Sequence, residues 1–289
     1  MAWETVLYEE IGHVARITLN RPETHNVQNI RLIMELDEAT KKADADPNIR
    51  VILLRGAGKS FSSGHDLSPI PGDALQQEYR ERHRRSVEDR FWAEDEYYLS
   101  KCLAIRNLRK PTIAAIHGNV VLAGIMLACM CDLVIAAEST RLWNPSLRHC
   151  GTGGEVMVLP FELGFRKAKE YLWTGDVIPI HEAECLGMVN RVVPDDQLDA
   201  EALKLAERIA LMPPVSVSIT KRSFNKMQDF MGMAMAFEYH FVLHQIAHAT
   251  KESADWNAQA AEHSRERGFR GWLEFRDGPF EEQAKKKYS

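Results

Sequence analysis

Two glycine-centred loops are the segments of this sequence best suited to chemistry. The first, GKSFSSGHDLS (58–68), follows the apolar run Val51–Leu54, and the second, HGNVVLAG (117–124), follows Thr112–Ile116. Loops that follow parallel strands gather at one edge of a sheet, where glycine lets backbone N–H groups approach a ligand. A helix beginning at Ala123-Gly124 would add unpaired N–H groups. The loops therefore indicate either a pair of amides that binds an oxyanion or two tight turns.

Few side chains near these loops could move protons. The helical turn after Gly124, which contains Met126, is apolar and offers no carboxylate. His149 suits acid–base catalysis near neutral pH, with a surface histidine as the alternative. Glu155 is a second candidate base, but the sequence favours a first-turn carboxylate that stabilises the dipole of a helix opening after GTGG.

The elements that would position these loops follow an α/β order. Apolar runs at 51–54, 112–116 and 132–137 are typical of strands buried on both faces, and 5–19 reads as a hairpin. Helical periodicity covers 29–45 and 74–108, and the chain beyond about 155 is mostly helical apart from a strand at 189–193. Strands separated by helices require parallel crossovers, so the sequence predicts an α/β fold.

Composition excludes several functional classes. The net charge of −5 leaves no basic excess for nucleic acid. The five cysteines form no C-x-x-C pair, which indicates a reducing, cytoplasmic compartment, and the N-terminus does not resemble a secretory signal. The uncharged segment 111–131 is long enough to span a membrane, but His117, Asn119 and two glycines favour a buried strand, turn and helix, so no membrane span is predicted.

The run KPTIAAIHGNVVLAGIMLACMCDLVIAAEST closely resembles the signature of the enoyl-CoA hydratase/isomerase (crotonase) superfamily. RITLNRPETHNV, FSSGHDLS, LWTGDVIPIHEAECLGMVNRVVP and GWLEFRDGPF follow in family order, so the resemblance spans about residues 5–280. It implies a ClpP-like spiral of ββα units at 1–200, and a helical C-terminal region at 201–289 for trimerisation and for capping the site. It also implies a homotrimer or a homohexamer.

The resemblance further implies an acyl-CoA or enoyl-CoA substrate, with coenzyme A arriving as part of it and no tightly bound cofactor. By position, the thioester oxygen would lie between the amides of His65 and Ala123, provided that Ala123 avoids a positive φ. The two glutamates of family hydratases fall on Met126 and Ser146, which cannot act as carboxylate bases. The expected catalytic set is therefore His65, Ala123, Ser146, His149 and Glu155.

Positions expected to border the substrate or its nucleotide lie in three regions. They are Arg21, His25 and Val27, then Ser62, Ser63, Gly64, Asp66, Leu67 and Gly124, and finally Trp272 and Phe280 near the C-terminus. For Asp66, capping or anchoring its loop is the favoured role. The aromatic residues Phe91, Trp92, Tyr97 and Tyr98 predict either an acyl pocket or core packing.

Three histidines on one predicted helix face, His240, His244 and His248, raise the question of a metal. His240 and His248 lie about 12 Å apart along a helix axis, too far to share an ion, so no metal site is predicted.

The resemblance implies an enzyme that stabilises an enolate or an oxyanion, although the missing glutamates argue against ordinary hydration. Isomerisation, carbon–carbon cleavage and thioester hydrolysis through another base stay open. So do a non-catalytic acyl-CoA-binding protein and a scaffold.

Overall fold

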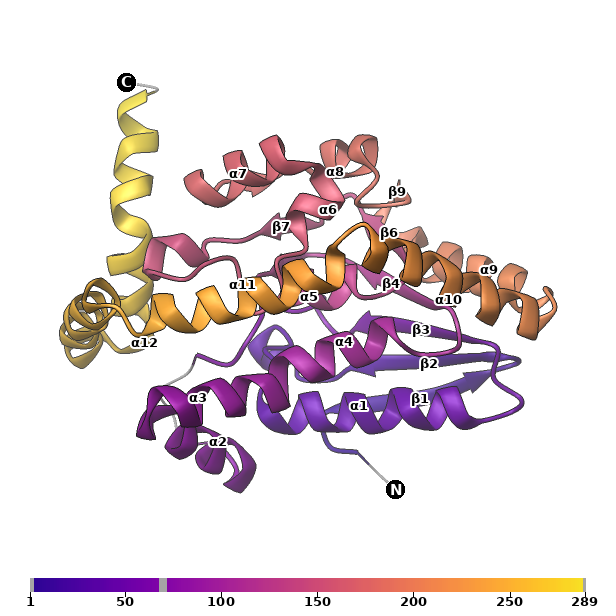
Figure 1. Cartoon of the computed structure of the whole chain (residues 1–289). Helices are drawn as coiled ribbons and strands as arrows, with labels where there is room; N and C mark the ends of the chain where they lie inside the picture. The colour runs from indigo at the N-terminus through magenta and orange to yellow at the C-terminus, as the bar shows by residue number, and fades with distance from the viewer. Residues whose placement is uncertain (1–2, 68–71, 288–289) are drawn as a thin grey trace.

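The structure, a computed structural model, describes residues 3–67 and 72–287 (Figure 1). Its strands are β1 (Val6–Ile11), β2 (Val14–Leu19), β3 (Val51–Gly56), β4 (Thr112–Ile116), β5 (Asn119–Val121), β6 (Leu133–Ala137), β7 (Arg141–Trp143), β8 (Val177–Ile178) and β9 (Arg191–Val193). Its helices are α1 (Ile30–Ala45), α2 (Ala74–Arg85), α3 (Val87–Glu94), α4 (Ser100–Arg106), α5 (Ala123–Cys129), α6 (Leu159–Leu163), α7 (Phe165–Thr174), α8 (Ile180–Leu186), α9 (Leu198–Ala210), α10 (Pro214–Phe230), α11 (Met233–His248) and α12 (Lys251–Lys287).

The main sheet has six strands in the order β1-β2-β3-β4-β6-β9. Strands β1 and β2 form the antiparallel hairpin, and each later neighbour is parallel. The apolar runs of β3, β4 and β6 are thus the adjacent parallel strands that the sequence predicts, and the α/β class is confirmed.

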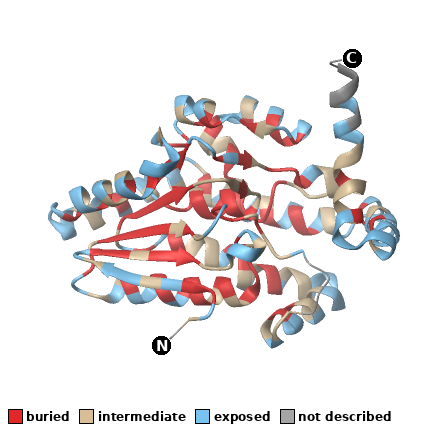
Figure 2. Ribbon diagram, turned by 180° about the vertical axis from the view of Figure 1, so that it is seen from behind, coloured by how far each residue is buried: buried red, intermediate tan, exposed pale blue. Residues whose placement is uncertain are grey.

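Alternate residues of the central strands enter two separate apolar layers. On one face Ile52, Leu54 and Ala114 pack in the core that contains α1. On the other face Leu53 and Ile113 pack against α9, whose inner residues recur every four positions at Leu198, Ala202, Ala206 and Ala210. Figure 2 shows the buried sheet between these helical layers. The expected division at residue 200 falls inside α9, and division into two domains stays a prediction.

The helical region predicted at 74–108 is broken in two places. Ser86 leaves helical geometry at φ −158° and its hydroxyl accepts a hydrogen bond from the Asp89 amide, so α2 ends and α3 begins there. A π-helical turn at Asp95–Leu99 then joins α3 to α4. Such turns commonly mark functional sites.

A second, three-stranded sheet, β5-β7-β8, was not predicted. Beyond β9, which lies within the strand expected at 189–193, the described chain is helical, and in Figure 1 α10 and α11 run across the front of the molecule while α12 lies at one end. Among the described helices, none combines the length and apolarity needed to cross a membrane. Segment 111–131 instead contains β4, β5 and α5, as the sequence predicts.

Candidate functional site

The two glycine-centred loops are held together by backbone hydrogen bonds. The Ser62 amide donates to Asn119 at 3.2 Å, and the Val121 amide donates to the Ser62 carbonyl at 3.0 Å. A Cβ placed on Gly64 would lie 2.8 Å from the Val121 oxygen and 3.4 Å from the Ala123 nitrogen. The strand order brings the ends of β3 and β4 side by side, and glycine permits the close approach.

The amides of His65 and Ala123 are both available at this junction. Gln28 bonds to the Gly64 carbonyl and to the Asp66 amide, the parallel pattern that leaves the intervening His65 N–H unused. Ala123 is the first residue of α5, where a backbone N–H has no partner within the helix. Across residues 3–67 and 72–287, no acceptor is paired with either amide.

The backbone just before Ala123 is strained. Leu122 has φ 49° and ψ −104°, a region that favours glycine, whereas Ala123 does not have a positive φ. The amide at Ala123 was predicted on the condition that this residue avoid a positive φ, and the structure meets that condition. The strained residue is its neighbour, Leu122. Strain of this kind persists only where surrounding contacts impose it, and it is frequent at functional sites.

A cavity of about 30 Å³ lies beside the two residues and is lined by both His65 and Ala123. Met126, Tyr97 and Tyr98 also line it, and the His65 ring stacks on Tyr98 with centroids 3.7 Å apart. This volume holds about one or two water molecules, so the aromatic side chains close the space. Of the other two aromatic residues, Phe91 packs against Phe241 in the core and Trp92 is 55% exposed.

Glu155 is a buried carboxylate in contact with the His65 side chain. Its Oε1 lies 3.5 Å from Nδ1 of His65 and 3.8 Å from Nε2 of His244, and among the described residues Oε2 has no hydrogen-bond partner. The helix-dipole interpretation is wrong, because α6 begins only at Leu159. Gly154 packs directly on Met126, so the loop places Glu155 beside the position that carries a glutamate in family hydratases.

The electrostatic environment favours an ionised Glu155. Burial alone would raise the pKa of this carboxyl group, but the nearby imidazoles of His65 and His244 outweigh burial and lower it. Glu155 is 5% exposed. The carboxylate is therefore free of a proton and can accept one from a bound substrate, while its lowered pKa makes it a weaker base than an ordinary glutamate.

The other expected catalytic residues lie in different surroundings. The Ser146 hydroxyl is buried and, among the described atoms, has no hydrogen-bond partner. The His149 ring packs against Trp256 and Trp272, with centroids 5.9 and 5.5 Å away, so it is not a free surface histidine. Burial, helped by Arg276, lowers the pKa of His149 to about 3, which leaves the ring neutral at pH 7.

The residues expected near the nucleotide form an internally bonded loop. Arg21 donates to the Val27 carbonyl at 2.8 Å and pairs with Asp66 at 3.2 Å, so Asp66 anchors the loop as predicted. The same loop is held by a 3.0 Å contact between His25 and Ser60, by the Ser63 amide, which donates to the His25 carbonyl, and by the Ser62 hydroxyl, which donates to Asn26.

Three expected contact residues lie on the surface or on α12. Leu67 is 51% exposed at the end of its loop. Trp272 and Phe280 belong to α12, where Phe280 lies 4.0 Å from the Arg148 guanidinium. Their contact with coenzyme A stays a prediction.

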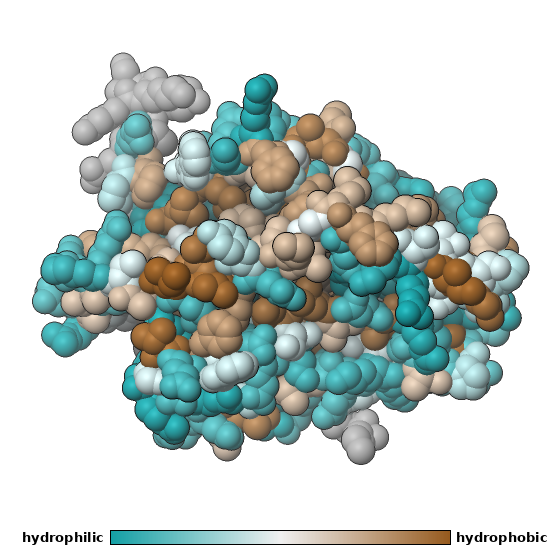
Figure 3. Space-filling model, in the orientation of Figure 1, coloured by the Kyte–Doolittle hydropathy of each residue, from teal (hydrophilic) through white to brown (hydrophobic). Residues whose placement is uncertain are grey.

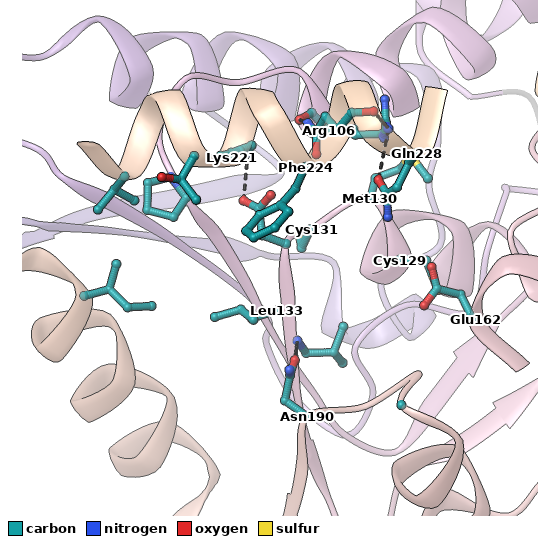
Figure 4. Close-up of a pocket in the computed structure, with 18 of the residues that line it drawn as sticks. Arg106, Cys129, Met130, Cys131, Leu133, Glu162, Asn190, Lys221, Phe224 and Gln228 are labelled. Atoms are coloured by element: carbon teal, nitrogen blue, oxygen red, sulfur yellow. Dashed lines mark hydrogen bonds and ion pairs between the residues drawn. The ribbon is translucent and has the colours of Figure 1, made fainter. Parts of the chain in front are cut away.

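A larger cavity of about 640 Å³ lies under α10, away from the two amides, and was not foreseen from sequence (Figure 4). Lys221 of α10 reaches the start of β6, where its Nζ lies 2.7 Å from Asp132. Phe224 and Glu162 also line this cavity. Burial raises the pKa of Glu162 to about 7.

Glu162 should make stability depend on pH. Folding takes up a proton between pH 4.5, the ordinary pKa of a glutamate, and about 7, so the free energy of unfolding falls as pH rises through that range. We expect Glu162→Gln to match the wild type near pH 4.5 and to exceed it by about 3 kcal/mol at pH 8. Urea unfolding at both pH values measures this, and an equal difference at each pH would contradict it.

Sequence reasoning missed the residues that extend this site behind Glu155. Glu94, at the end of α3, lies 3.4 Å from Nε2 of His244. The histidines of α11 were visible in the sequence, but their carboxylate partner lies on a distant segment and has no periodic relation to them.

Comparisons with known proteins agree with the family resemblance. A sequence model described as enoyl-CoA hydratase/isomerase matches residues 9–283. The chain is 41% identical over 261 residues to "Putative enoyl-CoA hydratase EchA13" of Mycobacterium tuberculosis, covering 86% of this chain and 81% of that protein. It is 33% identical to "Probable enoyl-CoA hydratase" of Rhizobium meliloti, covering 88% of this chain and 94% of that protein.

Solved structures give the same result. The crystal structure of an enoyl-CoA hydratase/isomerase from Xanthobacter autotrophicus has a TM-score of 0.84 and 32% identity, and covers 96% of this chain and 99% of that chain. A "probable enoyl-COA hydratase" from Mycobacterium thermoresistibile has a TM-score of 0.78 and 40% identity, covering 85% of this chain and 97% of that chain. The expected ββα spiral fold is therefore confirmed.

Proposed function

Since the chain belongs to the enoyl-CoA hydratase/isomerase family and thus acts on acyl-CoA thioesters, we propose that it moves a proton between carbons of an enoyl-CoA, with Glu155 as the base. The observation that carries this proposal is the buried carboxylate 3.5 Å from the ring of His65, a residue whose amide has no partner among the described residues. Met126 occupies the usual position of the catalytic carboxylate and cannot act as a base. Glu155, from the loop before α6, supplies the base instead.

The proposed reaction is a shift of the double bond. Glu155 removes a proton from the α carbon of a 3-enoyl thioester, and the electron pair moves toward the carbonyl to form a dienolate. The amides of His65 and Ala123 stabilise the oxygen that gains charge, at roughly 3–4 kcal/mol of barrier for each donor. Protonated Glu155 then returns the proton to the γ carbon of the same substrate, which leaves the double bond conjugated with the carbonyl, so the reaction needs no cofactor.

Hydration is the second candidate, because the His65 imidazole lies against Glu155 and adds a second group that can transfer a proton. The relatives are also named hydratases. Addition of water needs one group to activate the water and one to protonate the α carbon. Cleavage of a carbon–carbon bond, thioester hydrolysis and non-catalytic binding of acyl-CoA have no comparable contact in their favour.

Two substrates of equal length distinguish these possibilities. Double-bond migration in a 3-enoyl-CoA creates a conjugated thioester and raises its ultraviolet absorbance, whereas hydration of the 2-enoyl-CoA lowers it. We expect the first signal to dominate. If calorimetry shows that both thioesters bind but neither absorbance change occurs, the protein is a non-catalytic acyl-CoA-binding protein. If neither thioester binds, the scaffold role is favoured.

We further propose a homotrimer or homohexamer, assembled through α10 and α11. Figure 3 shows apolar side chains along these helices, where Phe230, Met231 and Met235 are 84%, 84% and 75% exposed. A surface of this kind is typical of an interface. We expect Phe230→Glu combined with Met235→Glu to give monomers in sedimentation equilibrium, and an unchanged mass would contradict this interface.

The compartment proposed is the cytoplasm. All five cysteines are free thiols, as a reducing environment would keep them. To test this, cells are lysed under acid quench, the protein is unfolded, and its free thiols are labelled with a thiol-specific reagent. Cysteines that do not react would contradict a reducing compartment.

A further inference from the structure

A second polar cluster lies between α3 and α11, behind Glu155. His244 and His248 occupy the last turns of α11, and Glu94 ends α3. The contact between Phe91 and Phe241, with ring centroids 5.0 Å apart, holds these two helices together one turn earlier (Figure 1). The cluster is therefore built on two packed helices and not on a mobile loop.

The ligating atoms in this cluster converge on one point. Nε2 of His244 lies 3.1 Å from Nε2 of His248 and 3.4 Å from Oε2 of Glu94, and all three atoms lie within 4.8 Å of one another. Ligands of a tetrahedral zinc ion, at about 2.0–2.1 Å from the metal, are about 3.4 Å from each other. The observed separations fit that spacing. Histidines at i and i+4 present both rings on one side of a helix, as metal-binding helices do.

Further contacts orient His244 and Glu94. Thr152 bonds to Nδ1 of His244 at 2.8 Å, which leaves Nε2 pointing at the cluster. His83 bonds to the other oxygen of Glu94 at 2.7 Å, and the Gln245 amide donates to Oε2. Metal sites commonly hold their ligands through such outer contacts.

The surroundings of this point are suited to a cation with one open position. Glu94 and His244 are 3% and 4% exposed, and His248 is partly exposed. Glu155 lies on the remaining side, with Oε1 3.8 Å from His244 and an Oε2 that has no partner among the described residues. An unpaired oxygen this deeply buried is costly unless it faces a cation or a bound water.

We propose that Glu94, His244 and His248 bind a first-row divalent cation of the zinc type, with an open fourth position that faces Glu155. The sequence argued against a metal because His240 and His248 are too far apart. The structure supplies Glu94 in place of His240, whose ring bonds to the Gly154 carbonyl at 2.9 Å instead. The ligand set of two histidines and one glutamate is one that zinc accepts.

The test uses the full chain after dialysis against a chelator, titrated with Zn²⁺ by calorimetry. We expect one site per chain in the wild type, and affinity lower by on the order of 100-fold in both His248→Gln and Glu94→Gln. His240→Gln is the matched control on the same helix and should keep the wild-type affinity. Because Glu94→Gln removes a buried charge, its thermal unfolding is compared with that of His248→Gln, a partly exposed position that is safer for folding.

Substitution with Co²⁺ identifies the ligands without any measurement of turnover. The expected visible spectrum is that of a tetrahedral ion bound by nitrogen and oxygen, with no thiolate charge-transfer band. A thiolate band would assign the metal to a cysteine and overturn the proposal. So would the absence of a zinc site in the wild type, or equal affinity in wild type, His248→Gln and Glu94→Gln.

Discussion

Glu155→Gln is expected to lower kcat for double-bond migration by about 1000-fold while the affinity for the thioester changes little. Glutamine has nearly the same shape as glutamate and can still accept a hydrogen bond through its amide oxygen, but it cannot take up the proton that the reaction must move. The two amides are retained, so the oxyanion is still stabilised and substrate still binds. Single-turnover kinetics with a 3-enoyl-CoA, together with calorimetry of a saturated acyl-CoA, separate the two quantities.

The matched control is Glu162→Gln, which also removes a glutamate charge but replaces a half-buried residue in the cavity under α10. Its kcat should stay within about threefold of the wild type, because it touches neither amide. Comparable losses in the two variants would indicate a general effect of removing a glutamate charge. Full activity in Glu155→Gln would exclude this residue as the base.

The central sheet could be predicted because parallel strands buried on both faces must be apolar at consecutive positions. Val51–Leu54 and Thr112–Ile116 show this pattern without interruption, and their alternate side chains enter the two opposite layers. The smaller sheet could not be predicted from periodicity. Strands β5 and β7 have three residues each and β8 has two, too few to establish an alternation.

The amide pair was predictable for a related reason: glycines follow two buried strands, and parallel strands bring such loops to one edge.

Glu155 was misassigned because glycines before a carboxylate resemble the start of a helix. In the structure Gly153 and Gly154 have φ values of 112° and 107°, which keep the chain out of helical geometry and direct Glu155 inward. Pairing of His244 with Glu94 joins segments 150 residues apart, and no local pattern predicts that.

Gly124 lies at the contact between the two loops, and its substitution is expected to have the second large effect. A Cβ at this position would lie 2.4 Å from the Ser62 carbonyl oxygen, with the Ser62 carbonyl carbon at 3.2 Å. Both are backbone atoms that cannot rotate away. Alanine normally stabilises a helix relative to glycine by about 1 kcal/mol, but here the clash reverses the sign. We expect Gly124→Ala to lower the free energy of unfolding by about 3 kcal/mol.

Gly124→Ala should also reduce turnover, because separating Ser62 from α5 moves the Ala123 amide away from that of His65. A displacement of about 1 Å in a positioned group costs about 100-fold in kcat. Urea unfolding and steady-state kinetics measure the two effects. Gly12→Ala, at the β1–β2 turn with φ 58° and open space around it, should lose about 1 kcal/mol of stability and keep its turnover. A Gly124→Ala protein with wild-type stability and turnover would show that the two loops do not depend on their close contact, and the paired amides would then lose their structural basis.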